Sequence, residues 1–119
     1  MIKGNLYKLA SLSFSDAGYV ADVDLLPGSE IFKAHFPCKP ITPGVCLVQI
    51  AVEIASVIEK RNLTLAEAKD IKFLSVISPL EHKSVRYELS KMDDEGKWVV
   101  CIYAGGQLCS KMSVRLCNV

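Results

Sequence analysis

The sequence predicts an α+β fold in which one antiparallel β-sheet wraps one long buried helix, in the order β-β-α-β-β-β-β. Eleven of the fourteen residues from Val45 to Ile58 are apolar, and a helix that is apolar nearly all round is buried on nearly all sides. Two strand-like segments precede this helix and four follow it, with turn signals between them. The 119 residues have the length of one domain, over 1–119.

Composition and charge exclude several classes of protein. Half of the residues are hydrophobic, the mean hydropathy is +0.28 and the net charge is +1, which excludes a disordered chain. The 14 basic residues are balanced by 13 acidic ones, which argues against a nucleic-acid partner. The longest apolar stretch is too short and too interrupted to span a membrane. The first residues show no secretory signal, so we expect a cytoplasmic protein.

The five cysteines show no metal-binding pattern. No Cys-x-x-Cys pair is present, and neither histidine lies at zinc-ligand spacing from a cysteine. An odd number of cysteines in a cytoplasmic protein indicates reduced thiols. We therefore expect no metal and no cofactor.

Two strands are expected before the helix, over residues 6–14 and 18–25. Asp16-Ala17-Gly18 is a turn signal between them. Apolar residues at every second position from Tyr19 to Leu25 are typical of a half-buried strand. The two segments therefore form a hairpin.

Four strands are expected after the helix, because these segments are rich in β-branched and aromatic residues. Asp93-Asp94-Glu95-Gly96 and Gly105-Gly106 are the hairpin turns that join the last three strands. The four predicted strands cover about 69–78, 83–92, 97–104 and 107–116.

The helix is expected to begin with Thr42 as N-cap and Pro43 at the first helical position, and to end near Lys60 or Arg61. Its polar residues Gln49, Glu53 and Ser56 form one narrow stripe. Such a stripe either meets partners at a subunit interface or solvent, or lines a cleft. The chain is too short to cover both faces of the sheet, so we expect a second copy to cover one.

The segment before the helix is suited to hold a catalytic group. Three prolines within the seven residues from Pro37 to Pro43 stiffen the loop and fix the position of His35. Gly44 opens the helix, where backbone N–H groups lack intrahelical acceptors. Such an N–H can donate to the oxygen of a polarised carbonyl.

The segment from His35 to Val48 (HFPCKPITPGVCLV) resembles the signature of the hotdog-fold 3-hydroxyacyl-acyl-carrier-protein dehydratases of fatty-acid biosynthesis. The resemblance extends to Ile31-Phe32-Lys33, more weakly to 72–79, and to the final hairpin. It implies a lyase that eliminates water from a 3-hydroxyacyl thioester to give a 2-enoyl thioester. The implied substrate is carried by acyl carrier protein or coenzyme A, and the implied assembly is a dimer whose sites span both subunits.

The resemblance also implies roles for individual residues. His35 would remove the proton α to the thioester carbonyl, and Gly44 would donate its N–H to that carbonyl. Phe36 and Val45 are assigned to substrate binding.

The chain departs from the family at the acid. Fourteen residues after His35, where the family has a carboxylic acid, stands Gln49; Glu53 stands one turn later, where the family often has glutamine. Glutamine has no titratable proton, so we keep Gln49 and Glu53 as the catalytic pair with Glu53 as the candidate acid. Cys38, and Leu80 and Glu81 after Pro79, also depart from the pattern.

Three functions follow from this pattern. The first is a dehydratase that uses Glu53. The second is a hotdog thioesterase, in which Gln49 positions the attacking water. The third is a non-catalytic subunit, which pairs with an active dehydratase or binds acyl chains.

Overall fold

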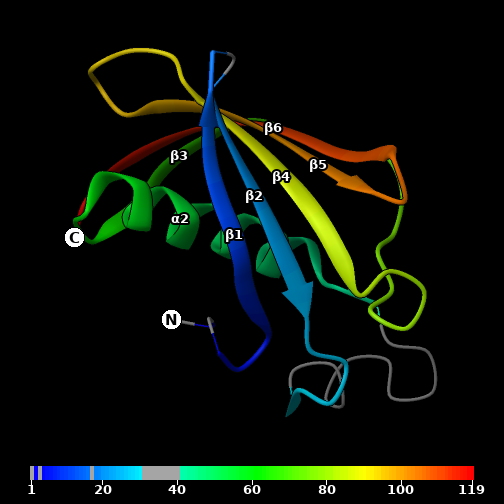
Figure 1. Cartoon of the computed structure of the whole chain (residues 1–119). Helices are drawn as coiled ribbons and strands as arrows, with labels where there is room; N and C mark the ends of the chain where they lie inside the picture. Colours follow the sequence, from blue (N-terminus) through cyan, green and yellow to red (C-terminus); the bar gives the residue numbers. More distant parts are fainter. Residues whose placement is uncertain (1, 3, 17, 31–40) are drawn as a thin grey trace.

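The computed structural model describes residues 2, 4–16, 18–30 and 41–119. Within them, one helix packs against a six-stranded antiparallel sheet with the strand order β1-β2-β4-β5-β6-β3 (Figure 1). The predicted fold class is confirmed. The elements are β1 (Tyr7–Ser15), β2 (Gly18–Leu25), α2 (Gly44–Glu59), β3 (Leu63–Phe73), β4 (Ser84–Lys91), β5 (Lys97–Ala104) and β6 (Gln107–Asn118).

The core lies between the sheet and α2. Alternate residues of the central strands point toward the helix, as period-two patterning requires. Val23 lies opposite Val85, and Val100 lies opposite Met112, so that their side chains form continuous rows. From the helix, Ile50 and the residues 51–55 are buried against these rows. The predicted strands 18–25 and 97–104 match β2 and β5, because their alternation is complete.

The prediction for the strand after the helix was wrong in its bounds. The sequence predicted 69–78, whereas β3 runs from Leu63 to Phe73. The pairing with β6 sets these bounds, since Leu63 lies opposite Asn118 and Phe73 opposite Ser110. Nearly all residues of β3 are exposed in the single chain, so burial leaves no alternation in its sequence.

The predicted cap of the helix was also wrong. Pro43 is the N-cap: its backbone is extended, and its carbonyl accepts the N–H groups of Cys46 and Leu47 at 3.0 and 3.2 Å. Thr42 lies one residue earlier and donates its N–H to the carbonyl of Ile77 at 2.8 Å. Helix α2 ends at Glu59, and Lys60 takes a left-handed conformation with φ of 57°.

Thr42→Val is expected to stabilise the protein by about 1 kcal/mol. Thr42 is 4% exposed, and among the described residues its hydroxyl has no hydrogen-bond partner. A buried unpaired hydroxyl costs roughly 1–3 kcal/mol, and valine replaces it with a methyl group of similar size. Urea unfolding measures the change, with Thr64→Val, an exposed position, as the control. A loss of stability in Thr42→Val would show that the hydroxyl is paired.

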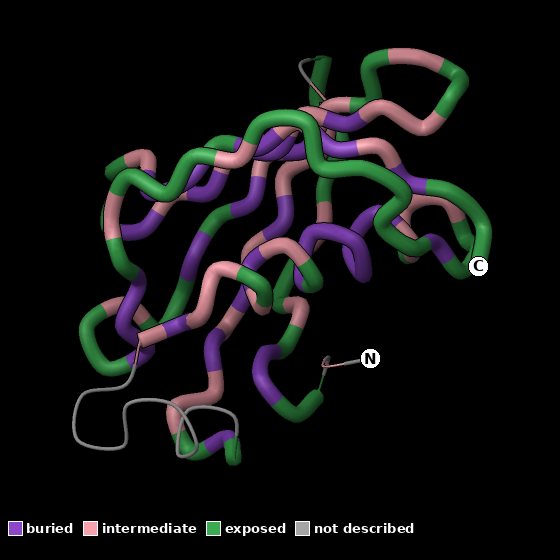
Figure 2. The backbone as a smooth tube through the Cα atoms, turned by 180° about the vertical axis from the view of Figure 1, so that it is seen from behind, coloured by how far each residue is buried: buried purple, intermediate pink, exposed green. Residues whose placement is uncertain are grey.

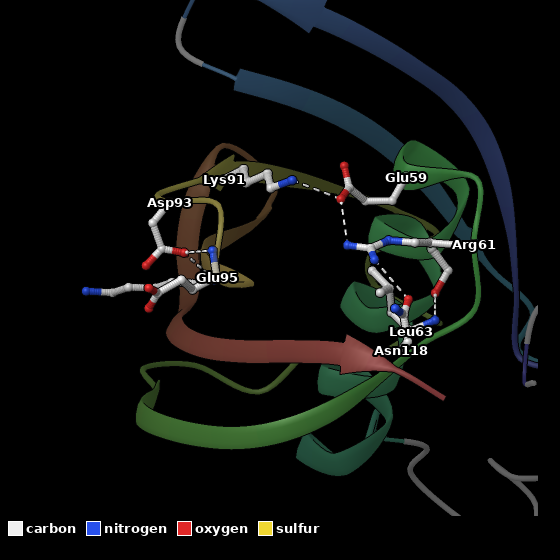
Figure 3. Close-up of polar contacts among 9 residues, drawn as sticks. Glu59, Arg61, Leu63, Lys91, Asp93, Glu95 and Asn118 are labelled. Carbon is white, nitrogen blue, oxygen red and sulfur yellow. Dashed lines mark hydrogen bonds and ion pairs between the residues drawn. The ribbon is translucent and has the colours of Figure 1, made fainter.

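The far end of α2 is tied to the sheet by charged groups. The Glu59 carboxylate accepts hydrogen bonds from Lys91 Nζ at 2.9 Å and from Arg61 at 3.2 Å (Figure 3). The hydrogen bond from Lys91 is the main cause that lowers the pKa of Glu59. Ser56 Oγ accepts the N–H of Leu63, which fixes the short turn into β3.

Lys91→Met is expected to lower stability by about 0.5 kcal/mol at pH 7, the size of a partly exposed ion pair. Because the pKa of Glu59 is lower in the folded state, the ion pair stabilises the protein above the unfolded pKa of about 4.3. That contribution is lost as the pH falls through the folded pKa. Unfolding measured between pH 7 and pH 2.5 tests this, with the exposed Lys111→Met as control. A difference between Lys91→Met and the wild type that persists at pH 2.5 would contradict it.

The first two turns of the helix are open on one side in the single chain, since Val45 is 76% exposed and Gln49 is exposed. Buried and exposed stretches of the backbone can be followed in Figure 2. The prediction of a helix buried on nearly all sides holds for its middle, where the six consecutive residues 50–55 are buried, and does not hold for its first two turns. In the part of the chain that the structure describes, no helix is long and apolar enough to cross a membrane.

Candidate active site

The candidate site begins at the first turn of α2. Cys46 and Leu47 donate the first helical hydrogen bonds to Pro43, so the N–H groups of Gly44 and Val45 precede the intrahelical ladder. The positive end of the helix dipole adds to their donor character. Donors at a helix start are suited to bind a carbonyl oxygen, and the role predicted for the Gly44 N–H stays a prediction.

Phe73, a residue that the sequence analysis missed, packs on Gly44. A Cβ atom at position 44 would come within 2.6 Å of Cζ of the Phe73 ring, so any side chain there would have to displace the ring. The ring comes from the end of β3 and is 52% exposed. Phe73 and Val45 thus add partly exposed apolar surface next to the helix start.

Gln49 and Glu53 lie one helical turn apart and are hydrogen-bonded to each other. Gln49 Nε2 donates to Glu53 Oε2 at 2.9 Å. Gln49 is exposed, whereas Glu53 is 2% exposed and points into the protein. The polar stripe predicted from the sequence therefore has an outer member and an inner member with different surroundings.

Two groups from the N-terminal part of the chain also donate hydrogen bonds to Glu53. The Tyr7 hydroxyl donates to Glu53 Oε1 at 3.0 Å, and the Ile2 N–H donates to Oε2 at 2.9 Å. Tyr7 is 46 residues away from Glu53 in the chain, so no local pattern could link the two. The one available signal was the rule that a buried carboxylate needs donors.

The electrostatics of this group follow from burial. Burial is the main cause that raises the pKa of Tyr7 far above its usual value, and the charge of Glu53 and its hydrogen bond raise it further. Tyr7 therefore remains a protonated donor at any physiological pH. Among the described residues, the Glu53 carboxyl group accepts hydrogen bonds from Tyr7, Ile2 and Gln49, so both of its oxygens are engaged within the protein.

His35, Phe36 and Cys38 lie outside the described residues, and their predicted roles stay predictions. The described part of the site offers a helix-start N–H donor, an exposed amide at Gln49 and apolar surface from Val45 and Phe73. These groups can hold a thioester carbonyl and a neighbouring polar group. Among the described residues, no group of three His, Cys, Asp or Glu side chains could hold a metal ion.

A cavity of about 490 Å³ lies elsewhere, on the face of the sheet that points away from α2. Its lining includes Asp22 and Arg86, whose charged groups are 3.7 Å apart, and Glu88 and Tyr103. It lacks the helix-start donors, so we place the candidate site at α2.

One helix wrapped by a six-stranded antiparallel sheet is the hotdog fold, which solved structures of dehydratases share. The fold is similar to that of the dehydratase heterocomplex ApeI:P from Xenorhabdus doucetiae, with a TM-score of 0.79 and 16% identity over 94% of this chain and 98% of that chain. It is also similar to the dehydratase domain from the CurK module of curacin polyketide synthase, with a TM-score of 0.57 and 17% identity over 97% of this chain and 44% of that chain.

The chain belongs to the ApeI dehydratase family, whose model matches residues 12–113. It is also 30% identical over 71 residues to the 3-hydroxyacyl-[acyl-carrier-protein] dehydratase FabZ of Coxiella burnetii, which covers 59% of this chain and 50% of that protein. The FabZ of Levilactobacillus brevis is 27% identical over 85 residues, which covers 66% of this chain and 57% of that protein. The chain thus spans about half the length of the curated relatives it matches, and it is a dehydratase-like hotdog protein.

Proposed function

We propose that this protein binds 3-hydroxyacyl thioesters at the start of α2 and takes part in their dehydration to 2-enoyl thioesters. The observation that carries the proposal is the helix start, where the Gly44 N–H precedes the intrahelical hydrogen bonds and can donate to a polarised carbonyl oxygen. Membership of the ApeI dehydratase family supports the reaction class. The carrier is acyl carrier protein or coenzyme A, and the expected location is the cytoplasm.

In this proposal each residue of the site has its own role in the dehydration. The N–H of Gly44 polarises the thioester carbonyl, which makes the α proton more acidic, and His35 removes that proton. Val45, Phe36 and Phe73 contact the acyl chain. Gln49 lies where the leaving 3-hydroxyl is expected. The 3-hydroxyl can leave as water only if it receives a proton, and Gln49 has no titratable proton to give.

A second function is favoured by the arrangement of Gln49 and Glu53. Gln49 has no titratable proton, and the carboxylate of Glu53 is buried and engaged by Tyr7, Ile2 and Gln49. A chain with this pair could serve as the non-catalytic subunit of a complex whose active subunit supplies the acid. The fold neighbour from Xenorhabdus doucetiae is itself described as a heterocomplex.

We further propose that a second hotdog subunit, either another copy of this chain or an active dehydratase, covers the open side of the molecule. The exposed apolar residues Val45, Phe73, Leu74 and Val76 support this, because large apolar side chains gathered near one helix end are unusual on a monomer. Light scattering at micromolar concentration tests the homodimer; a monomer would leave the heteromeric arrangement as the assembly.

The central experiment incubates the purified protein with 3-hydroxyacyl and 2-enoyl thioesters and follows elimination, hydration and thiol release together. Elimination and hydration without thiol release would support the dehydratase. Thiol release alone would support the thioesterase, which Gln49 could serve by positioning water. Binding without any turnover would support the non-catalytic subunit, and neither binding nor turnover would overturn the proposal.

A further inference from the structure

We propose that Tyr7 and Glu53 are positioning residues that hold the Gln49 amide with its NH₂ group inward and its carbonyl oxygen outward. The outer end of Gln49 then recognises the 3-hydroxyl of a hydroxyacyl thioester as a hydrogen-bond acceptor. The choice of ligand rests on the proposed function, whereas the orientation of the amide rests on the contacts of Glu53 alone.

The orientation follows from the chemistry of the two partners. A carboxylate has only acceptor oxygens, so the group of Gln49 that lies 2.9 Å from Glu53 Oε2 must be its NH₂. The reverse orientation would bring the amide oxygen against the carboxylate oxygen, which repels it. The Gln49 carbonyl oxygen is therefore on the outer side, where Gln49 is exposed.

Tyr7 and Ile2 hold the carboxylate that sets this orientation. The Tyr7 hydroxyl occupies Oε1 at 3.0 Å, and the Ile2 N–H shares Oε2 with Gln49. Both Tyr7 and Glu53 are almost fully buried, which restricts their side chains to one arrangement. The start of β1 and the middle of α2 thus fix the outermost polar group of the helix.

An outward acceptor selects ligands with a donor. A 3-hydroxyl can donate to the Gln49 carbonyl, whereas a saturated chain offers nothing at that position. Sites built to hydrogen-bond a ligand hydroxyl discriminate strongly against analogues that lack it. Gln49 would therefore determine specificity for the hydroxyacyl form, with Tyr7 and Glu53 acting through it.

The first test is nuclear magnetic resonance of the full-length protein without ligand. The sequence contains two glutamines, Gln49 and the exposed Gln107, so the side-chain amide signals have an internal control. Exchange of the Gln49 Nε2 protons with solvent is expected to be at least tenfold slower than that of Gln107. Tyr7→Phe and Glu53→Gln are expected to remove most of this difference. Equal exchange at both glutamines in the wild type would overturn the fixed orientation without any variant.

The second test compares two pantetheine thioethers that differ only in a 3-hydroxyl on the acyl chain. The wild type is expected to bind the hydroxylated analogue at least tenfold more tightly. In Glu53→Gln this preference should fall below threefold, while the affinity for the analogue without the hydroxyl changes less than twofold. If Glu53 had a merely structural role, Glu53→Gln would weaken the binding of both analogues by the same factor.

The outcomes separate the two proposals. Equal binding of the analogues to the wild type would overturn recognition by Gln49. If the Gln49 amide exchanges slowly but neither analogue binds, the fixed orientation of the amide is supported. The same result would overturn the proposed function and, with it, the choice of ligand. If Glu53→Gln fails to fold, amide-proton exchange at Gln49 in the wild type and in Tyr7→Phe still tests whether the amide orientation is fixed.

Discussion

Gln49→Glu is expected to raise the rate of 3-hydroxyacyl thioester dehydration by about 10²- to 10⁴-fold, the contribution of a well-placed general acid. The new carboxyl group would lie within hydrogen-bond distance of Glu53, because Gln49 Nε2 is 2.9 Å from Glu53 Oε2. Two carboxylates this close cannot both ionise easily, so the pKa of one rises and a proton stays available near neutral pH. The acid then stands at the position that the family resemblance assigns to it.

The double variant Gln49→Glu/Glu53→Gln is expected to be as active as Gln49→Glu and more stable. It restores the family's order of acid and amide, and it removes the repulsion between two carboxylates. Gln107→Glu introduces the same substitution at an exposed position and should leave the rate unchanged. The measurement is the initial rate of 2-enoyl thioester formation. If both Gln49 variants stay at the wild-type rate, a missing acid is not what limits turnover in this chain.

Glu53→Leu is expected to lower the free energy of unfolding by about 3 kcal/mol. Leucine fills a similar volume, but the Tyr7 hydroxyl and the Ile2 N–H lose their acceptor. Each unpaired polar group costs roughly 1–3 kcal/mol when buried, and relief from burying the charge offsets part of the sum. Urea unfolding measures this loss of unfolding free energy, provided that its dependence on urea concentration is the same in the variant and the wild type.

Two controls separate the hydrogen bonds from the helix itself. Glu59→Leu makes the same substitution on the same helix at its partly exposed end, where about 1 kcal/mol or less is expected because only surface ion pairs are lost. Adding Tyr7→Phe to Glu53→Leu should recover about 1 kcal/mol, since it removes the stranded hydroxyl. Equal losses in the two Glu→Leu variants would show that the buried network contributes no more than the surface pairs.

Local periodicity was sufficient to predict the fold class and most of the elements. Burial in the core recurs at every second residue in β2 and β5, which gives these strands their alternation. In α2 it recurs with each helical turn, which gives the helix its apolar run. The Gly105-Gly106 turn was predictable for a similar reason, because both residues have positive φ, which glycine adopts without strain. The role of Gly44 came from its place at the start of a helix, and the role of His35 from family resemblance.

The remaining features depend on contacts between residues that are distant in the chain. The bounds of β3 follow from β6, and Phe73 reaches Gly44 only because β3 ends beside the helix start. Helix α2 begins after Pro43 rather than Thr42, since the Thr42 N–H pairs with Ile77. The sequence placed Gln49 and Glu53 on one stripe, and the tertiary structure gave the two hydrogen-bonded residues different surroundings. Tyr7 and Ile2, from the N-terminal part of the chain, make Glu53 a buried acceptor, while Gln49 stays at the surface. The physical reason is that only the packed chain determines which side of a helix meets donors and which meets solvent.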